Sequence, residues 1–146
     1  MKPINEMKLQ FQSHSVNEAF ARAAVAAFAA QLDPHIEELA DLKTAVSEAV
    51  TNCIVHAYPH SVGEITLRAQ LFADGLVKVR VRDRGVGIPD IKQAMEPLFT
   101  TLGGERAGLG FAVMESFCDR VTVTSRVGKG TCVTLVRRFD GRDADG

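Results

Sequence analysis

The stretch Ser47-Glu48-Ala49-Val50-Thr51-Asn52-Cys53-Ile54-Val55-His56 closes a long segment with helical periodicity. Glu48 and Asn52 are four residues apart, so on a helix they lie one turn apart on the same face. They fall at the edge of an apolar stripe formed by Leu39, Leu42, Val46, Ala49, Val50 and Cys53. A carboxylate and a carboxamide at that border can point into a cleft, where they would serve as proton acceptor and metal ligand. An ordinary amphipathic helix with two polar edge residues is the alternative, and the rest of the chain has to decide between them.

Composition limits the classes of protein that this chain can be. At 146 residues and 46% hydrophobic content, we expect one globular domain over residues 1–139, followed by a polar tail over 140–146. The net charge of −1 does not favour direct nucleic-acid binding, and no apolar run reaches the roughly 18 residues that a membrane span needs. The beginning of the chain has no apolar signal-peptide core. Cys53, Cys118 and Cys132 are expected to be buried thiols of a reducing compartment, so the prediction is a soluble cytoplasmic protein without a membrane partner.

The periodicity predicts an α+β fold. Ser15 and Glu18 match a capping box that would open a helix from Val16 to about Leu32, and Asp33 with Pro34 would start the next helix, which runs to about Ala57. Further helices are expected from Asp90 to about Glu96 and over Phe111–Cys118. Apolar and polar residues alternate in stretches typical of strands: Met7–Phe11, Ile65–Leu71, Val77–Arg82, Val121–Ser125 and Cys132–Val136.

Two turns and one histidine pair have plain structural interpretations. Asp74-Gly75 predicts a hairpin between two of these strands. Gly128-Lys129-Gly130-Thr131 looks like part of a Walker loop but precedes a strand, so it is expected to be a hairpin turn. His56 and His60 are separated by Pro59, which argues against a metal pair on a helix.

Asp83-Arg84-Gly85-Val86-Gly87 follows a predicted strand directly. Burying the Asp83 carboxylate without donors would be costly, and the exocyclic amine of a purine would supply a donor. Gly85 and Gly87 allow the backbone to curl close to a flat ring. A common Asp-Gly turn is the alternative interpretation, and the stretch is not the dinucleotide fingerprint because no third glycine follows at the needed spacing.

Gly108 and Gly110 precede a predicted helix and would expose backbone N–H groups at its positive end. This arrangement suits phosphate oxygens, to which Arg106 could add a charge-assisted contact. A simple tight turn is the alternative. Residues 97–107 have no clean period and are interpreted as a loop.

Taken in order, these motifs resemble the GHKL ATP-binding superfamily, which includes gyrase, histidine kinases and mismatch-repair ATPases. A narrower likeness, from about Asn5 to Leu135, is to the sporulation anti-sigma F factors, which are small serine-protein kinases. It is carried by Phe20-Ala21-Arg22, by Leu32-Asp33-Pro34, by Ser47–Asn52, by Val81–Ile91 and by Pro97-Leu98-Phe99-Thr100-Thr101. The resemblance implies a Bergerat-type two-layer α/β sandwich with a mixed, mostly antiparallel sheet covered on one face by helices.

The resemblance also implies roles for individual residues. Glu48 would accept the proton of an attacking serine hydroxyl, and Asn52 would hold Mg²⁺. Asp83 would bind the adenine amine of ATP or ADP in a pocket shaped by Gly85 and Gly87. Thr131 would sit near the adenine end, and Arg22 would lie on the surface that meets protein partners. The lid over the phosphates would include Thr100, Thr101, Arg106, Gly108 and Gly110.

The function implied is that of an anti-sigma factor and ATP-dependent serine kinase. As a homodimer it would bind a sporulation sigma factor and would phosphorylate a serine of an anti-anti-sigma protein. At 146 residues the chain has no room for a phosphoacceptor-histidine helix pair or a transducer domain, which argues against a complete sensor kinase. Two alternatives stay open: a nucleotide-dependent binding module without catalysis, and a related serine kinase of a general stress response. Glu48 argues against the first, since binding alone needs no base there.

Overall fold

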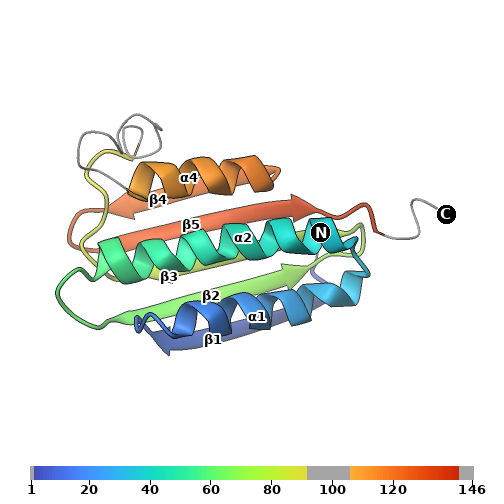
Figure 1. Cartoon of the computed structure of the whole chain (residues 1–146), viewed down its shortest axis with the longest axis horizontal. Coiled ribbons are helices and arrows are strands. Elements are labelled where there is room, and N and C mark those ends of the chain that lie inside the picture. The colour runs from blue at the N-terminus through green and yellow to red at the C-terminus, as the bar shows by residue number, and fades with distance from the viewer. Residues whose placement is uncertain (1, 92–105, 142–146) are drawn as a thin grey trace.

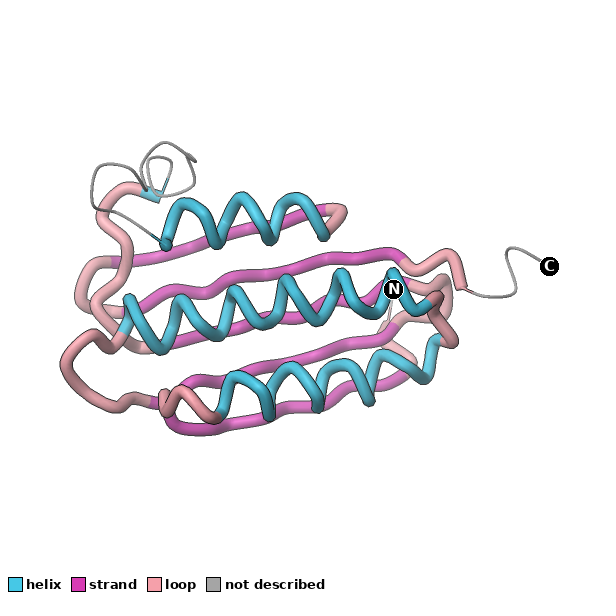
Figure 2. Tube along the Cα trace, in the orientation of Figure 1, coloured by secondary structure: helices cyan, strands magenta, loops and turns pink. Residues whose placement is uncertain are grey.

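Helices cover one face of a five-stranded antiparallel sheet in the computed structural model, which describes residues 2–91 and 106–141 (Figure 1). Figure 2 shows the long helices lying side by side over the strands. The first half of the chain contains β1 (Asn5–Gln12), α1 (Asn17–Ala29), a short 3₁₀ turn (Ala30–Leu32) and α2 (Ile36–Asn52). A π-helical turn (Cys53–Ala57) then leads to β2 (Glu64–Leu71) and β3 (Leu76–Asp83), and the described remainder contains α4 (Arg106–Phe117), β4 (Arg120–Arg126) and β5 (Gly130–Arg138).

The strands lie in the order β1-β2-β3-β5-β4. We expected a mixed, mostly antiparallel sheet, but all four adjacent pairs among the described strands are antiparallel. The predicted hairpins are confirmed: β2 and β3 meet through the turn at Gly75, where φ is 89°, and β4 and β5 meet through Gly128 and Gly130. The Gly-Lys-Gly sequence is therefore a hairpin turn and not a phosphate loop.

The core lies between the sheet and the helices. Strand alternation buries one row of side chains from β2 and β3, including Leu67 and Val79, while the intervening polar residues face away from the helices. The apolar stripe of α2 packs onto this row, with Leu42, Val46 and Val50 fully buried. Small residues on α1, such as Ala21 and Ala29, are also fully buried, which allows that helix to pack closely.

Both predicted helix caps are wrong. The α1 helix begins at Asn17 with Val16 at the cap position, and the Glu18 carboxylate contacts Ser47 and Arg22 instead of the backbone at Ser15. A tertiary contact with Ser47 and an ion pair with Arg22 of the same helix have replaced the capping box. Asp33 has a left-handed backbone, with φ of 51°, and the α2 helix starts after His35.

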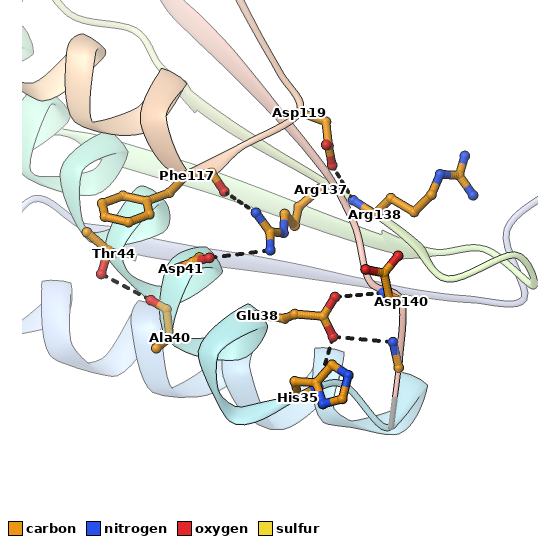
Figure 3. A network of polar contacts seen from close by, with 11 residues as sticks. His35, Glu38, Ala40, Asp41, Thr44, Phe117, Asp119, Arg137, Arg138 and Asp140 are labelled. Carbon is orange, nitrogen blue, oxygen red and sulfur yellow. Dashed lines mark hydrogen bonds and ion pairs between the residues drawn. The ribbon is translucent and has the colours of Figure 1, made fainter. Parts of the chain in front are cut away.

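A polar network holds the end of the molecule where α2 begins and β5 ends (Figure 3). Glu38, 7% exposed, accepts backbone N–H bonds from His35 and Gly141 on one carboxylate oxygen, at 2.9 and 3.3 Å, and from Asp140 on the other, at 2.6 Å. Burial alone would raise the pKa of Glu38, but these donors hold it below its usual value. Arg137 links Asp41 of α2, at 3.3 Å, to the Phe117 carbonyl at the end of α4, at 3.2 Å.

Some expectations fall outside the described residues. The helix predicted over Asp90–Glu96 lies almost wholly in the part that is not described, as does most of the polar tail. No helix within residues 2–91 and 106–141 combines the length and apolar character that crossing a bilayer requires. Within the same residues, no group of three or more His, Cys, Asp or Glu side chains is placed to hold a metal ion.

Candidate nucleotide-binding site

One pocket brings together the residues that the sequence singled out in separate motifs. It has a volume of about 50 Å³ and lies between the C-terminal end of α2, the end of β3, the start of β5 and α4. Asn52 and Asp83 both line it, together with Gly87 and Thr131. Its walls are otherwise mostly apolar and are formed by Ala49, Cys53, Ala57, Ile88, Phe111 and Val133, with His56 also at the wall. An apolar slot with a few polar groups is the usual form of a small-molecule site.

Asp83 is the buried carboxylate of this pocket and is 5% exposed. Its Oδ1 accepts two backbone N–H bonds, from Gly85 at 2.9 Å and from Thr131 at 3.1 Å. Its Oδ2 contacts only the Cys53 thiol, at 3.4 Å, among the described residues. A thiol is a weak donor, so Oδ2 keeps most of its capacity to accept a hydrogen bond from a ligand.

Cys53 is a residue that the sequence assigned only to the core. Burial raises the pKa of its thiol far above the usual value, and the neighbouring Asp83 carboxylate adds to the rise. The thiol therefore stays protonated at neutral pH and donates to Asp83 Oδ2. Its place in the apolar stripe whose edge carries Glu48 and Asn52 indicated a position near the cleft but not its contact with Asp83.

The loop after β3 follows the backbone of the π-helical turn. The Val86 N–H donates to the Ala57 carbonyl at 3.0 Å, and a β-carbon at Gly85 would collide with that same carbonyl. Gly87 has φ of 79°, and a β-carbon there would collide with the Arg126 carbonyl. Both glycines are thus required by close backbone approach, and Gly87 also lines the pocket. Helix turns of the π type occur often at functional sites.

Thr131 lies at the start of β5, buried to 9% exposure, beside Asp83. Its hydroxyl forms a 2.7 Å hydrogen bond with the hydroxyl of Ser125, which accepts the Ile88 N–H at 2.7 Å. Ser125, which sequence reasoning missed, thereby ties the glycine loop to the β4–β5 hairpin. Alternation along β4 predicted a strand but did not distinguish Ser125 from the other polar residues of that strand.

Glu48 and Asn52 lie where α4 crosses α2. A β-carbon at Gly110 would be 3.2 Å from Glu48 Oε2, 3.2 Å from Asn52 Oδ1 and 3.4 Å from Asn52 Nδ2. The absence of a side chain at Gly110 therefore lets α4 approach both polar groups. Asn52 Nδ2 is buried without a hydrogen-bond partner among the described residues, a costly state that a polar ligand would relieve.

Several predicted site residues stand apart from this pocket or cannot be placed. Gly108 and Gly110 lie inside α4, which begins at Arg106, and do not precede it. Of the two, only Gly108 is in the first turn, where backbone N–H groups have no hydrogen-bond partner within the helix. The Arg106 side chain, Thr100 and Thr101 lie outside the described residues. Arg22 lies on α1, away from the pocket lining, and pairs with Glu18 at 3.4 Å.

A larger hollow of about 410 Å³ lies on the open face of the sheet, lined by Arg80, Arg82, Arg126 and Lys129 among others. It also reaches Asp83 and Thr131, but no aliphatic or aromatic side chain among the described residues lines it, and four of its lining residues are cations. The smaller pocket fits a nucleotide base better because its buried carboxylate oxygen faces apolar side chains.

Comparison with known proteins supports the same conclusion. The family model described as histidine kinase-like ATPase domain matches residues 11–137. The anti-sigma F factor of Caldanaerobacter subterraneus subsp. tengcongensis is 58% identical over 140 residues, which cover 95% of this chain and 96% of the relative. The chain belongs to the anti-sigma F factor family. The anti-sigma F factor of Geobacillus kaustophilus is also similar, at 55% identity over 92% of this chain and 93% of the relative.

A solved structure supports the fold of this anti-sigma F factor family member. The structure of the RsbU and RsbW domains of Rv1364c from Mycobacterium tuberculosis superposes with a TM-score of 0.69. It is 24% identical and covers 94% of this chain and 33% of that one, so the likeness concerns the fold alone. The match to an ATPase domain shows that the chain is a kinase-like protein that uses ATP and therefore binds a nucleotide.

Proposed function

We propose that this chain is an ATP-dependent protein-serine kinase that also acts as an anti-sigma factor. It would bind a sporulation sigma factor and transfer phosphate to a serine of a small anti-anti-sigma protein, working as a homodimer in the cytoplasm. The observation that carries the proposal is the arrangement of one pocket: Asn52 and Asp83 line it together, and Glu48 lies one turn from Asn52 at the Gly110 contact. The names of the relatives favour the sporulation role over a general stress response.

The residues fit a purine nucleotide. Asp83 Oδ2 has room to accept an exocyclic amine, and the apolar walls suit the ring. Asn52 Oδ1 is the ligand that this chain would offer to Mg²⁺, and its unpartnered Nδ2 marks the side chain as prepared for a polar group. When bound, Mg²⁺ would supply neutralisation of phosphate charge.

Glu48 is proposed as the proton acceptor for the serine hydroxyl. It is partly exposed on α2 and lies in the same small region as Asn52, where a nucleophile and the terminal phosphate would meet. Phosphoryl transfer depends mainly on positioning and charge neutralisation, so a carboxylate that orients the hydroxyl is sufficient for this role. A binding module without catalysis would not require a carboxylate here.

The test is a transfer assay with Glu48→Gln. The purified chain is mixed with radiolabelled ATP, magnesium and a candidate anti-anti-sigma protein, and that protein is analysed for phosphoserine. We expect labelling with the unmodified chain and a loss of roughly a hundredfold or more with the variant, the usual scale for a general base. ATP affinity should be unchanged, because the carboxylate acts on the nucleophile.

Partner labelling that stays undiminished in Glu48→Gln would refute the role of this residue. Absence of labelling in the unmodified chain, with ATP binding retained, would favour the non-catalytic binding module. Thr44→Gln, on the exposed side of α2, is the matched control and should leave labelling unchanged.

A further inference from the structure

The open face of the sheet concentrates positive charge that the nucleotide pocket does not use. Strand alternation places there the side chains of Lys8, Arg68, Lys78, Arg80, Arg82, Arg120 and Arg126. Two acidic residues share this face: Glu6 of β1 accepts a hydrogen bond from Gln70, and Glu64 of β2 lines a hollow with Lys8, Arg82 and Arg84. The chain as a whole carries a net charge of −1, so the basic character belongs to this face and not to the overall composition.

The strand register brings like charges directly opposite one another. Lys8 of β1 pairs with Arg68 of β2, and Arg68 pairs with Arg80 of β3, so three cations form one row across the sheet. All three side chains are exposed, and none has an ion-pair partner within residues 2–91 and 106–141. Like charges in directly opposite positions destabilise a sheet. By contrast, Arg138 at the end of β5 is paired with Asp74 at 2.7 Å.

The basic row borders shallow hollows. One of about 240 Å³ is lined by Lys8, Thr66, Arg68, Arg80 and Arg82. It shares Arg80 and Arg82 with the hollow of about 410 Å³ that extends to Arg126 and Lys129. Guanidinium groups with free donors along a concave surface are suited to bidentate contacts with carboxylates.

We propose that this basic face, defined by Lys8, Arg68, Arg80, Arg82 and Arg126, docks an acidic segment of a protein partner. The choice of a protein as the occupant rests on the proposed function, in which the chain binds other proteins. Single-stranded nucleic acid fits less well, because no aromatic side chain stands on this face to stack a base. A second copy presenting the same face would bring the unpaired cations together, which like-charge repulsion opposes.

The test measures binding of a fluorescein-labelled peptide of 20 glutamates to the intact chain by anisotropy. We expect salt-dependent binding that is weakened roughly tenfold or more in Arg68→Glu/Arg80→Glu, because four units of charge change at the centre of the face. Arg68→Gln/Arg80→Gln should give an intermediate loss. The glutamine variant removes the repulsion between positions 68 and 80, whereas the glutamate variant replaces it with repulsion between two carboxylates. Both sites are exposed, so both variants should fold, which circular dichroism checks.

The control is Lys43→Glu, which reverses one charge on α2, on the helix-covered side of the sheet, and should bind the peptide normally. An equal loss in this control, or no binding by the unmodified chain, would overturn the proposal. Tighter binding of a 20-base-pair DNA duplex than of the peptide would assign the face to nucleic acid. Loss of a dimer in Arg68→Glu/Arg80→Glu, seen by sedimentation, would assign it to a second copy. Glu48→Gln should bind the peptide normally, so failure of this proposal is distinguishable from failure of the kinase assignment.

Discussion

Two buried carboxylates occupy opposite ends of this fold and are bound differently. Glu38, where α2 begins, has backbone N–H donors on both of its oxygens. Asp83, where β3 ends, has two such donors on Oδ1, while Oδ2 contacts only a thiol and faces a pocket. The comparison teaches that burial alone does not mark a site: a carboxylate whose oxygens are all engaged by backbone serves structure, and one with capacity left over can serve a ligand.

The largest expected effect comes from Asp83→Asn, which removes the acceptor oxygen that distinguishes Asp83 from Glu38. The new amide would keep an oxygen for the Gly85 and Thr131 N–H groups but would place donors where Oδ2 now accepts. A donor facing the adenine amine should weaken ATP binding by about 1–3 kcal/mol, or roughly 5- to 150-fold. Calorimetric titration with Mg·ATP measures this, and GTP, which has no amine at that position, serves as the comparison ligand. Unchanged ATP affinity would contradict the role of Oδ2.

Glu38→Gln should affect stability and leave the nucleotide site alone. The substitution turns one acceptor oxygen into an amide donor that faces backbone N–H groups, so a buried hydrogen bond is lost. We expect the free energy of unfolding to fall by about 1–3 kcal/mol, measured by urea denaturation. ATP affinity should match that of the unmodified chain, and a parallel loss of affinity would show that the two ends are coupled. Glu37→Gln is the control, since Glu37 is exposed on the same turn.

Lowering the pH should protonate the same Glu38 carboxylate, with a smaller effect on the free energy of unfolding. The folded pKa of Glu38 lies below its usual value of 4.5. Its ionised form therefore stabilises the fold fully above that value, and this contribution is lost as the pH falls through the folded pKa. Urea unfolding of the unmodified chain and of Glu38→Gln, repeated across this acidic range, should give free energies that converge at low pH. A constant difference between the two would contradict the assignment.

Local patterns in the sequence predicted much of the fold and part of the site. Alternation located the strands, because one face of each lies on the core, and Asp83 stood out as a carboxylate between a strand and two glycines. Glu38 could not be found in this way, since its donors Asp140 and Gly141 are 102 and 103 residues away along the chain. The capping box at Ser15 failed for a related reason: Glu18 reaches Ser47 and Arg22 instead. A local sequence motif therefore fails to predict the contacts of a side chain when a residue distant in the sequence binds that side chain instead.

The contacts of Cys53 and Gly110 also depend on tertiary packing. Periodicity placed Cys53 in the core but gave no indication that its thiol donates to Asp83. Gly110 was assigned to phosphate contact before a helix, whereas it lies within α4 and allows that helix to approach Glu48 and Asn52. In both cases the residue type indicated a special role, but the sequence could not identify the residue that it contacts, because that residue belongs to another helix or strand.

The most direct measurement is a crystal structure with magnesium and a non-hydrolysable ATP analogue. We expect the base to lie in the pocket between α2 and β5, with its exocyclic amine within hydrogen-bonding distance of Asp83 Oδ2, and the metal to lie on Asn52 Oδ1. A nucleotide seated instead in the basic hollow beside Arg80 and Arg126, with the pocket at Asp83 closed by side chains, would contradict it.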